Sequence, residues 1–172
     1  MSSPVLKDFS TLYASEYDVN VVDGRSIRNG ILKSETILGN SLMKTIDNGE
    51  MMSDEQMLDM YSSQMDLTKN NLIYEFPKNI KQLSLLERYM SEQELNIDKI
   101  VYFKVLDLNK TFNYAREKYG KVYDDIEIFA KRLSEYKSNR VKLFEILKLK
   151  YDFEEVDILT EENEIKKATN II

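Results

Sequence analysis

The chain has 172 residues, of which 42% are hydrophobic, and this length and composition suit one domain with a substantial core. Its net charge is −6 and its basic residues are scattered among acids, which argues against direct nucleic-acid binding as a main activity. It contains no cysteine and no histidine, so thiol chemistry, disulfides, imidazole bases and the usual zinc ligands are excluded.

Short runs rich in β-branched and aromatic residues predict strands, and helix-patterned segments separate them. The predicted strands are Val19–Val22, Leu72–Phe76, Ile100–Val105 and Val156–Leu159. The apolar faces that predict helices are Phe9, Leu12 and Tyr13, then Met57, Met60 and Tyr61, and then Ile80, Leu83, Leu86 and Met90. Strands that alternate with helices predict an α/β fold, with a parallel sheet and helices on both of its faces.

The C-terminal part of the chain predicts further helices. A long charged helix from Asp124 to about Leu149 has its apolar residues at Phe129, Leu133, Tyr136, Leu143, Phe144 and Leu147. A last helix, Glu161–Ile171, follows Thr160 and has acids in its first turn, which favours a helix N-terminus. No repeat and no Pro/Gly/Ser-rich linker interrupts the chain, so residues 1–172 are predicted to form a single domain.

No apolar stretch approaches the roughly 20 residues that a membrane-spanning helix needs. The N-terminal segment MSSPVLKDFS has neither the core of a signal peptide nor the Arg-rich pattern of a transit peptide. A soluble intracellular protein without membrane insertion is therefore expected. The default compartment is the cytoplasm, and an organelle is the alternative.

Five segments, in order, resemble motifs of the adenylate kinases and related nucleoside monophosphate kinases. LIYEFPKNIKQ, residues 72–82, is similar to the family's D-G-F-P-R-x-x-x-Q segment, and VVDGRSIRNG, residues 21–30, is similar to S-T-G-D-x-x-R. The other segments are LGNSLMKTIDNGEMMSDEQM (38–57), NIDKIVYFKVLD (96–107) and YDDIEIFAKRLSEY (123–136). The resemblance implies a reduced P-loop-kinase-like fold, with an adenylate-kinase-like parallel sheet.

The resemblance also implies a vestigial nucleotide site of the AMP-binding type. Its residues would be Gly24, Arg28, Lys78, Gln82 and Arg132. Residues 24–66 correspond to the segment of the family that binds the monophosphate. Residues 109–123 correspond to a short lid, in which Arg116 and Lys121 stand where the family has arginines.

Ordinary structural roles compete with nucleotide binding at several of these positions. Arg28 is equally well interpreted as a solvated helix residue near Glu35, and Gln82 is better interpreted as a helix-surface residue. For Arg132, ion pairing is slightly favoured, with Asp124, Asp125 or Glu135. The methionines of the monophosphate segment are expected to pack in the core rather than line a partner groove; they are Met43, Met51, Met52, Met57, Met60 and Met65.

Departures from the family motifs fall on the residues that handle phosphate. The P-loop, G-x-x-G-x-G-K-[GST], matches none of the 5 glycines, so this loop and the strand before it are expected to be missing. Tyr74 stands where the family has an aspartate that helps to hold the magnesium water shell, and Glu75 stands where it has a glycine. Lys78 replaces an arginine and loses its bidentate geometry. Asp23 replaces a threonine, and Arg25 replaces an aspartate.

These changes predict that the chain transfers no phosphate and has no catalytic or metal-binding residues. The favoured hypothesis is an inactive adenylate-kinase-like subunit that binds protein partners in a larger complex and has no cofactor. One alternative is an active nucleoside monophosphate kinase whose P-loop is missing from this sequence. The other is a regulatory module that binds AMP through Arg28, Lys78 and Gln82.

Loss of the first strand also predicts a rearranged sheet. The family's strand order is 2-3-1-4-5, which places the first strand between the counterparts of Leu72–Phe76 and Ile100–Val105. Without it, the two facing edges would carry unpaired backbone groups, which are costly to bury. Direct pairing of these strands into a four-stranded sheet is therefore favoured over insertion of a strand by a partner.

Overall fold

The computed structural model describes residues 4–31, 36–48, 52–104, 107–119, 126–127, 130–131, 134 and 140–157. The chain divides into two compact units, a central unit, Tyr17–Asn96, and a terminal unit made of Met1–Glu16 and Ile97–Ile172. The single-domain hypothesis stays a prediction. None of the helices in the described ranges combines the length and the apolar character that crossing a membrane requires.

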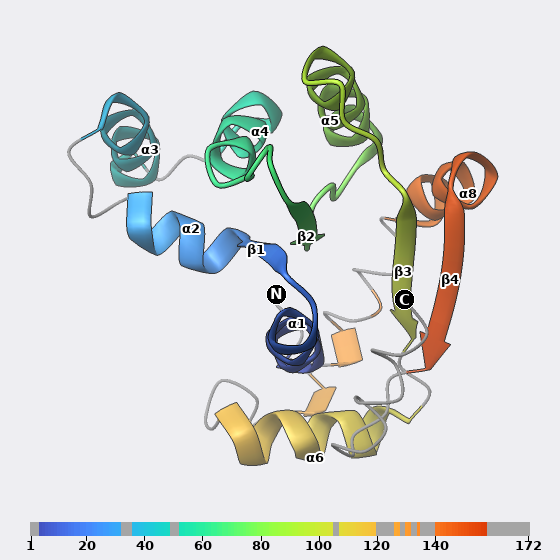
Figure 1. Ribbon diagram of the computed structural model, residues 1–172. Coiled ribbons are helices and arrows are strands. Elements are labelled where there is room, and N and C mark those ends of the chain that lie inside the picture. Colours follow the sequence, from blue (N-terminus) through green and yellow to red (C-terminus); the bar gives the residue numbers. More distant parts are fainter. Residues whose placement is uncertain are drawn as a thin grey trace. The chain divides into compact units, whose positions relative to one another are not determined.

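The central unit is built on two parallel strands, β1 (Val19–Asp23) and β2 (Asn70–Tyr74). They pair in register from Val19 opposite Asn70 to Asp23 opposite Tyr74, so both strands end at the same edge. Its helices are α2 (Gly24–Ile31), α3 (Ile37–Asp47), α4 (Asp54–Ser62) and α5 (Ile80–Glu92). α4 packs against α2, α3 and α5 (Figure 1).

The core of the central unit confirms two of the predicted helix faces. Its buried apolar residues are Val22, Ile27, Leu42, Met57, Met60, Tyr61, Phe76, Leu83, Leu86 and Met90. Core packing is therefore confirmed for Met57 and Met60, whereas Met51 and the side chain of Met43 lie outside the described part. Ile80, predicted on the same face as Leu83, is exposed at the first position of α5.

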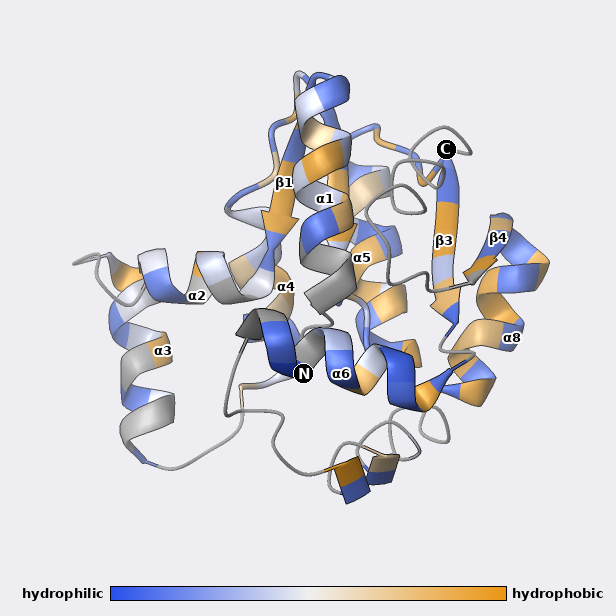
Figure 2. Ribbon diagram, turned by 90° about the horizontal axis from the view of Figure 1, so that it is seen from below, coloured by the Kyte–Doolittle hydropathy of each residue, from blue (hydrophilic) through white to orange (hydrophobic). Residues whose placement is uncertain are grey.

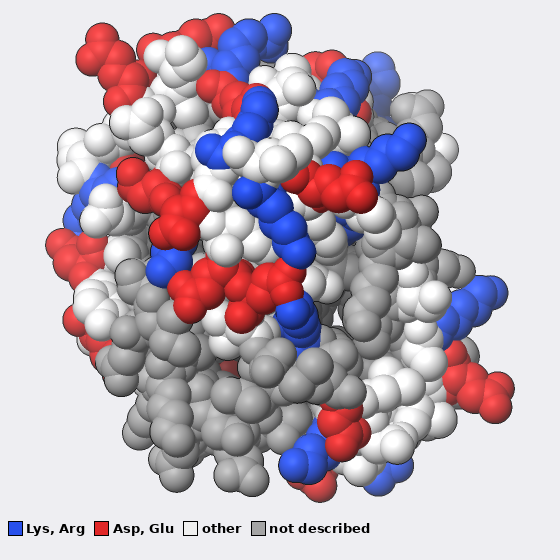
Figure 3. Space-filling model, turned by 90° about the vertical axis from the view of Figure 1, so that its right-hand side faces the viewer, with Lys and Arg blue, Asp and Glu red and all other residues white. Residues whose placement is uncertain are grey.

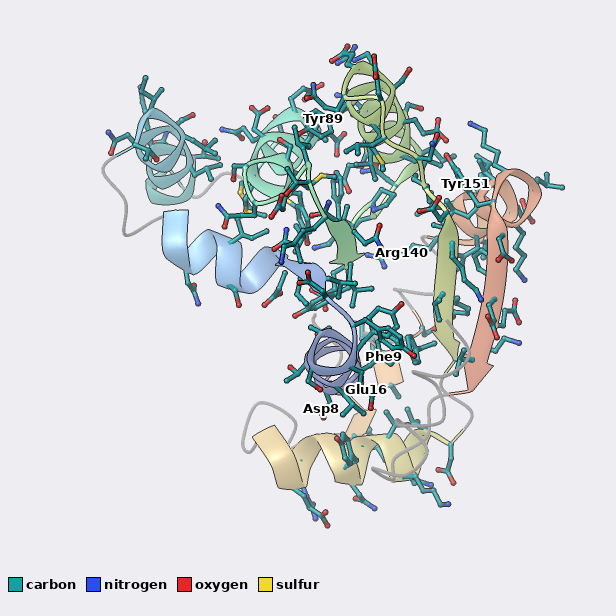
Figure 4. The ribbon with its side chains drawn as sticks, viewed as in Figure 1. Asp8, Phe9, Glu16, Tyr89, Arg140 and Tyr151 are labelled. Carbon is teal, nitrogen blue, oxygen red and sulfur yellow. The ribbon has the colours of Figure 1, made fainter. Side chains whose placement is uncertain are left out.

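The terminal unit holds a second pair of parallel strands. Its elements are α1 (Pro4–Glu16), β3 (Lys99–Lys104), α6 (Leu108–Tyr119), α8 (Val141–Lys150) and β4 (Asp152–Asp157). β3 pairs with β4 from Lys99 opposite Asp152 to Lys104 opposite Asp157. Phe9 of α1 points toward β3 and meets the ring of Phe103 edge-on, with centroids 4.9 Å apart (Figure 4). Apolar residues run along β3 (Figure 2).

The last strand begins four residues earlier than predicted, at Asp152 instead of Val156. Residues 158–159 of the predicted strand lie outside the described residues. The apolar pattern misses the start of β4 because Glu154 and Glu155 lie within it. The Nζ of Lys99 lies 2.7 Å from the Glu154 carboxylate, and Lys104 and Lys148 both pair with Glu155. Figure 3, which looks onto the side of Figure 1 where β4 and α8 lie, shows acidic and basic side chains interleaved.

Helix is confirmed at Val141–Lys150, but the predicted long helix is wrong in its continuity, because α8 begins there as a separate helix. Arg140, the residue before it, has φ −117° and ψ 0°, which is not helical backbone. Leu143 and Leu147 are buried on α8, as their spacing predicted. Most of residues 124–139, and all of the predicted helix Glu161–Ile171, lie outside the described residues.

The α/β class with parallel strands is confirmed, since β1 pairs with β2 in the central unit and β3 pairs with β4 in the terminal unit. Direct pairing of β2 with β3 into a four-stranded sheet stays a prediction, because the two strands belong to different units. Among the described residues β1 to β4 are the only strands. Insertion of a strand by a partner stays a prediction.

Candidate functional site

The edge at which β1 and β2 both end is the candidate site, because α/β proteins bind ligands at the carboxyl ends of parallel strands. We call the residues Asp23, Gly24, Tyr61, Tyr74 and Glu75 the carboxyl edge. Asp23 and Tyr74 are the last residues of β1 and β2, and Gly24 is the first residue of α2. Glu75 begins the turn between β2 and α5, and Tyr61 reaches the edge from α4.

Asp23 binds the start of α2 with its own carboxylate. Its Oδ2 accepts hydrogen bonds from the backbone N of Ser26 at 3.2 Å and from the Ser26 hydroxyl at 2.6 Å. The first backbone N–H groups of a helix are the groups that attract an anion. At α2 a carboxylate of the chain itself already occupies this position.

The side chain of Tyr61 extends from α4 and packs against the carboxyl edge inside the core of the central unit. Its side chain is only 1% exposed, and its ring stacks on Phe76 with centroids 4.5 Å apart and an interplanar angle of 17°. The hydroxyl donates to the carbonyl of Tyr74 at 3.3 Å, and its oxygen lies directly against Gly24. Burial, followed by the negative charges of Glu75 and Asp23, raises the pKa of the Tyr61 phenol above its usual range. The phenol is therefore a neutral hydroxyl at any physiological pH.

Only glycine fits at position 24, because the Tyr61 hydroxyl occupies the space that a Cβ would need. A Cβ at this position would lie 2.2 Å from the phenol oxygen of Tyr61, far inside van der Waals contact. The resemblance singled out Gly24 as part of a nucleotide site, and the structure gives it a packing role at the same edge.

Glu75 combines an unusual backbone with a buried acid. Its φ is 64°, in the left-handed region that glycine adopts without steric penalty and other residues adopt at a cost. Its Oε1 is buried, and its charge acts on the phenol of Tyr61. The edge therefore carries two carboxylates, from Asp23 and Glu75, where a phosphate-binding site would need positive charge.

Gln82 is buried, with 6% of its surface exposed, so the favoured interpretation as a helix-surface residue is wrong. Its Oε1 accepts from the backbone N of Lys78 at 2.7 Å, and its Nε2 donates to Oδ1 of Asp54 at 2.9 Å. Asn79, which caps α5 by accepting from the Gln82 backbone N, donates to the same Asp54 oxygen at 3.0 Å. The amide of Gln82 thus holds the turn after β2 against the start of α4.

Asp54 is the centre of this network. The hydrogen bond from Asn79 is the largest of the influences that lower the pKa of its carboxyl group, and the bond from Gln82 adds to it. Lys81 lies 3.7 Å from Asp54 and 2.8 Å from Glu55, which adds favourable charge interactions. The network fixes the N-termini of α4 and α5 to each other.

The structure brings only part of the predicted nucleotide site together. Gly24 and Lys78 follow the ends of neighbouring strands, and Lys78 is half-buried in its turn. Arg28 lies on α2, but its side chain is outside the described part of the chain, as are Arg132 and Lys121 entirely. Arg116 belongs to the terminal unit, where it is exposed on α6 with its guanidinium 5.9 Å from the centre of the Phe112 ring.

The side chain that sequence reasoning missed is Tyr61. Its spacing from Met57 and Met60 predicted a buried ring, but nothing assigned a role to its hydroxyl. A buried tyrosine needs a hydrogen-bond partner, and that requirement was the available signal. Within the described ranges, no three acidic side chains gather in a way that could hold a metal ion. With Tyr74 at the end of β2, the donors at this edge do not fit a magnesium–triphosphate complex.

Comparisons with known proteins agree with the motif pattern. No family model matches the chain. An adenylate kinase of Parabacteroides distasonis is 25% identical over 139 residues, which cover 78% of this chain and 73% of that protein. An adenylate kinase of Phytoplasma australiense is 34% identical over 98 residues, 53% of this chain and 45% of that protein. One of Bacteroides thetaiotaomicron is 23% identical over 148 residues, covering 83% and 78%.

These similarities cover most of the segments that resemble the family's motifs. The small parallel sheets and the helices beside them are consistent with a reduced P-loop-kinase-like fold. The chain is therefore similar to adenylate kinases, at 23–34% identity.

Proposed function

We propose that the chain is a catalytically inactive relative of the adenylate kinases that serves as a structural or interaction subunit. The observation that carries this proposal is the chemistry of the carboxyl edge. Asp23 caps α2 with its own carboxylate, and Glu75 adds a buried acid beside it. Phosphoryl transfer depends on positioned positive charge, and these residues put negative charge at the place where phosphate would approach.

The hydrogen bonds of Gln82 support the same proposal. A glutamine that reads a base needs its amide oxygen and nitrogen to face the ligand. Here the oxygen accepts from Lys78 N and the nitrogen donates to Asp54, so the side chain already works as a structural tie. The central unit keeps a packed core around these ties, which is what a retained fold with a different role requires.

The first experiment is a coupled assay for ADP formation with magnesium, ATP and AMP, CMP or UMP. The adenylate kinase of Parabacteroides distasonis, tested in parallel, is the positive control. We expect no turnover above the blank. Magnesium-dependent turnover would overturn the proposal and favour the active kinase alternative.

AMP binding is tested separately by calorimetric titration with AMP and ADP. The proposal predicts no heat of binding. If AMP binds and Lys78→Ala or Arg28→Ala abolishes the binding, the regulatory alternative replaces the proposal. Lys44→Ala, on the exposed surface of α3, is the matched control for loss of a positive charge.

The interaction role is tested by size-exclusion chromatography of native extract, with the chain detected by antibody. We expect elution with a complex larger than the isolated chain, resistant to dilution. Elution at the size of the purified protein would contradict a role as a stable subunit.

A further inference from the structure

We propose that Asn29 is a site of spontaneous deamidation, and that opening of the last turn of α2 sets the rate of this reaction. The pair Asn29-Gly30 lies in that turn, since α2 ends at Ile31. Both residues are exposed, and no other described part of the chain comes within 4 Å of the place where a Cβ of Gly30 would lie. The modification is covalent chemistry of the chain itself and does not depend on the proposed function.

The reaction joins two groups that an Asn-Gly pair places side by side. The backbone nitrogen of Gly30 attacks the side-chain carbonyl carbon, Cγ, of Asn29 and closes a succinimide ring. The proton of that nitrogen leaves together with the side-chain amide nitrogen as ammonia. Water then adds across one of the two ring C–N bonds, which gives aspartate or isoaspartate at position 29. Glycine favours ring closure, because it has no side chain to hinder the attacking nitrogen.

A closed α2 opposes this reaction. In an α-helix ψ is about −42°, and each N–H is directed along the axis toward the carbonyl four residues earlier. Ring closure needs a different ψ at Asn29 and a Gly30 nitrogen that is free to turn toward Cγ. The last turn of α2 must therefore open before the ring can form.

The contacts that hold α2 lie in its first half. The carboxylate of Asp23 accepts from the backbone N and the hydroxyl of Ser26, and Ile27 is buried, with 5% of its surface exposed. Asn29 and Gly30 lie beyond these contacts and are exposed. A helix of 8 residues is too short to be stable by itself, and helix ends fray. Brief opening of the last turn is therefore expected in the folded chain.

The product of the reaction opposes closure of the turn. It places a carboxylate near the helix C-terminus, where the partial negative charge of the carbonyl groups repels it. Isoaspartate also adds a methylene group to the backbone, which disrupts the helical spacing. Each conversion therefore weakens the end of α2 irreversibly and adds a negative charge to a chain whose net charge is −6.

Incubation of the folded full chain in 18O-labelled water at mildly alkaline pH tests the proposal. Lysyl endopeptidase, used afterwards in ordinary water, releases residues 8–33 as one peptide, because cleavage follows Lys7 and Lys33. Fragmentation of this peptide in a mass spectrometer then shows whether Asn29 has gained 18O. We expect gain at Asn29 at about one-tenth of the rate in denaturing urea, the protection that about one backbone hydrogen bond provides.

Two variants separate the chemistry from the helix. Gly30→Ala hinders the attacking nitrogen in open space, so it should slow the gain of 18O about tenfold or more in the folded chain and in urea alike. Asp23→Ala removes the cap of α2 and should raise the folded-chain rate toward the rate in urea.

Three results would overturn the proposal. Absence of 18O at Asn29 of the folded chain, while Asn29 converts in urea, would show that the site does not react. A folded-chain rate equal to the rate in urea would show that α2 does not control it, as would a rate that a folded Asp23→Ala variant leaves unchanged. The comparison with urea uses the unmodified chain, so the test remains decisive if Asp23→Ala does not fold.

Discussion

Substitution of Gly24 by alanine adds only one methyl group, but it should destabilise the chain strongly. The added Cβ would lie 2.2 Å from the phenol oxygen, 2.8 Å from Cζ and 3.2 Å from Cε2 of Tyr61. Forcing atoms into a packed core costs about 1–3 kcal/mol. Moving the hydroxyl off the Tyr74 carbonyl adds about 1 kcal/mol. The better helix propensity of alanine offsets about 1 kcal/mol at most. The free energy of unfolding should therefore fall by about 2 kcal/mol.

Urea-induced unfolding, monitored by far-UV circular dichroism, measures this change. Gly30→Ala is the matched control, because nothing lies within 4 Å of a Cβ at that position of the same helix. The control should be neutral or stabilise the chain by up to about 1 kcal/mol. In a Tyr61→Leu background, Gly24→Ala should lose most of its effect. Equal effects of Gly24→Ala and Gly30→Ala in the unmodified chain would refute the reasoning.

Three further predictions concern the acids of the central unit. Asp23→Ala removes the cap of α2 and should lower the free energy of unfolding by about 1 kcal/mol in urea titrations, whereas Asp23→Asn should retain most of the stability. Glu75→Gly relieves left-handed backbone strain and should stabilise the chain by about 1 kcal/mol. Glu75→Ala, which keeps the strain, is the control, and a larger gain in stability from alanine than from glycine would contradict this prediction. The folded-state pKa of Asp54 lies below its unfolded value of 3.8, so its stabilisation is present above that pH and is lost as the pH falls below it. Stability measured from pH 6 to about pH 2.5 should therefore decline less steeply in Asp54→Ala than in the unmodified chain.

Local patterns were enough to place most of the strands. β1, β2 and β3 begin within two residues of their predicted starts, because alternating β-branched and aromatic residues leave little choice of secondary structure. The start of β4 was not predicted, because its acidic residues look unfavourable in a strand until lysines from β3 and α8 pair with them. A sequence pattern shows the acids but cannot show the lysines that lie beside them in space.

The candidate site was predictable in position but not in chemistry. The spacing of the motifs located Gly24, Lys78 and Gln82 near the ends of the strands. It did not show that Gln82 bonds to Asp54, 28 residues away, or that Tyr61 bonds to a carbonyl 13 residues away. Such bonds depend on how α4 packs, and packing is decided by many side chains at once.

The charges between β3 and β4 have a consequence for how the chain finds its fold. Glu154 lies opposite Val101 and reaches back to Lys99, while Glu155 lies opposite Tyr102 and reaches forward to Lys104. Because neighbouring residues of a strand point to opposite faces, one ion pair marks each face of the ladder. A slip of the strands by one residue would turn both glutamates away from their lysines. The acids that hid β4 from the apolar pattern thus favour the observed alignment over one shifted by a single residue.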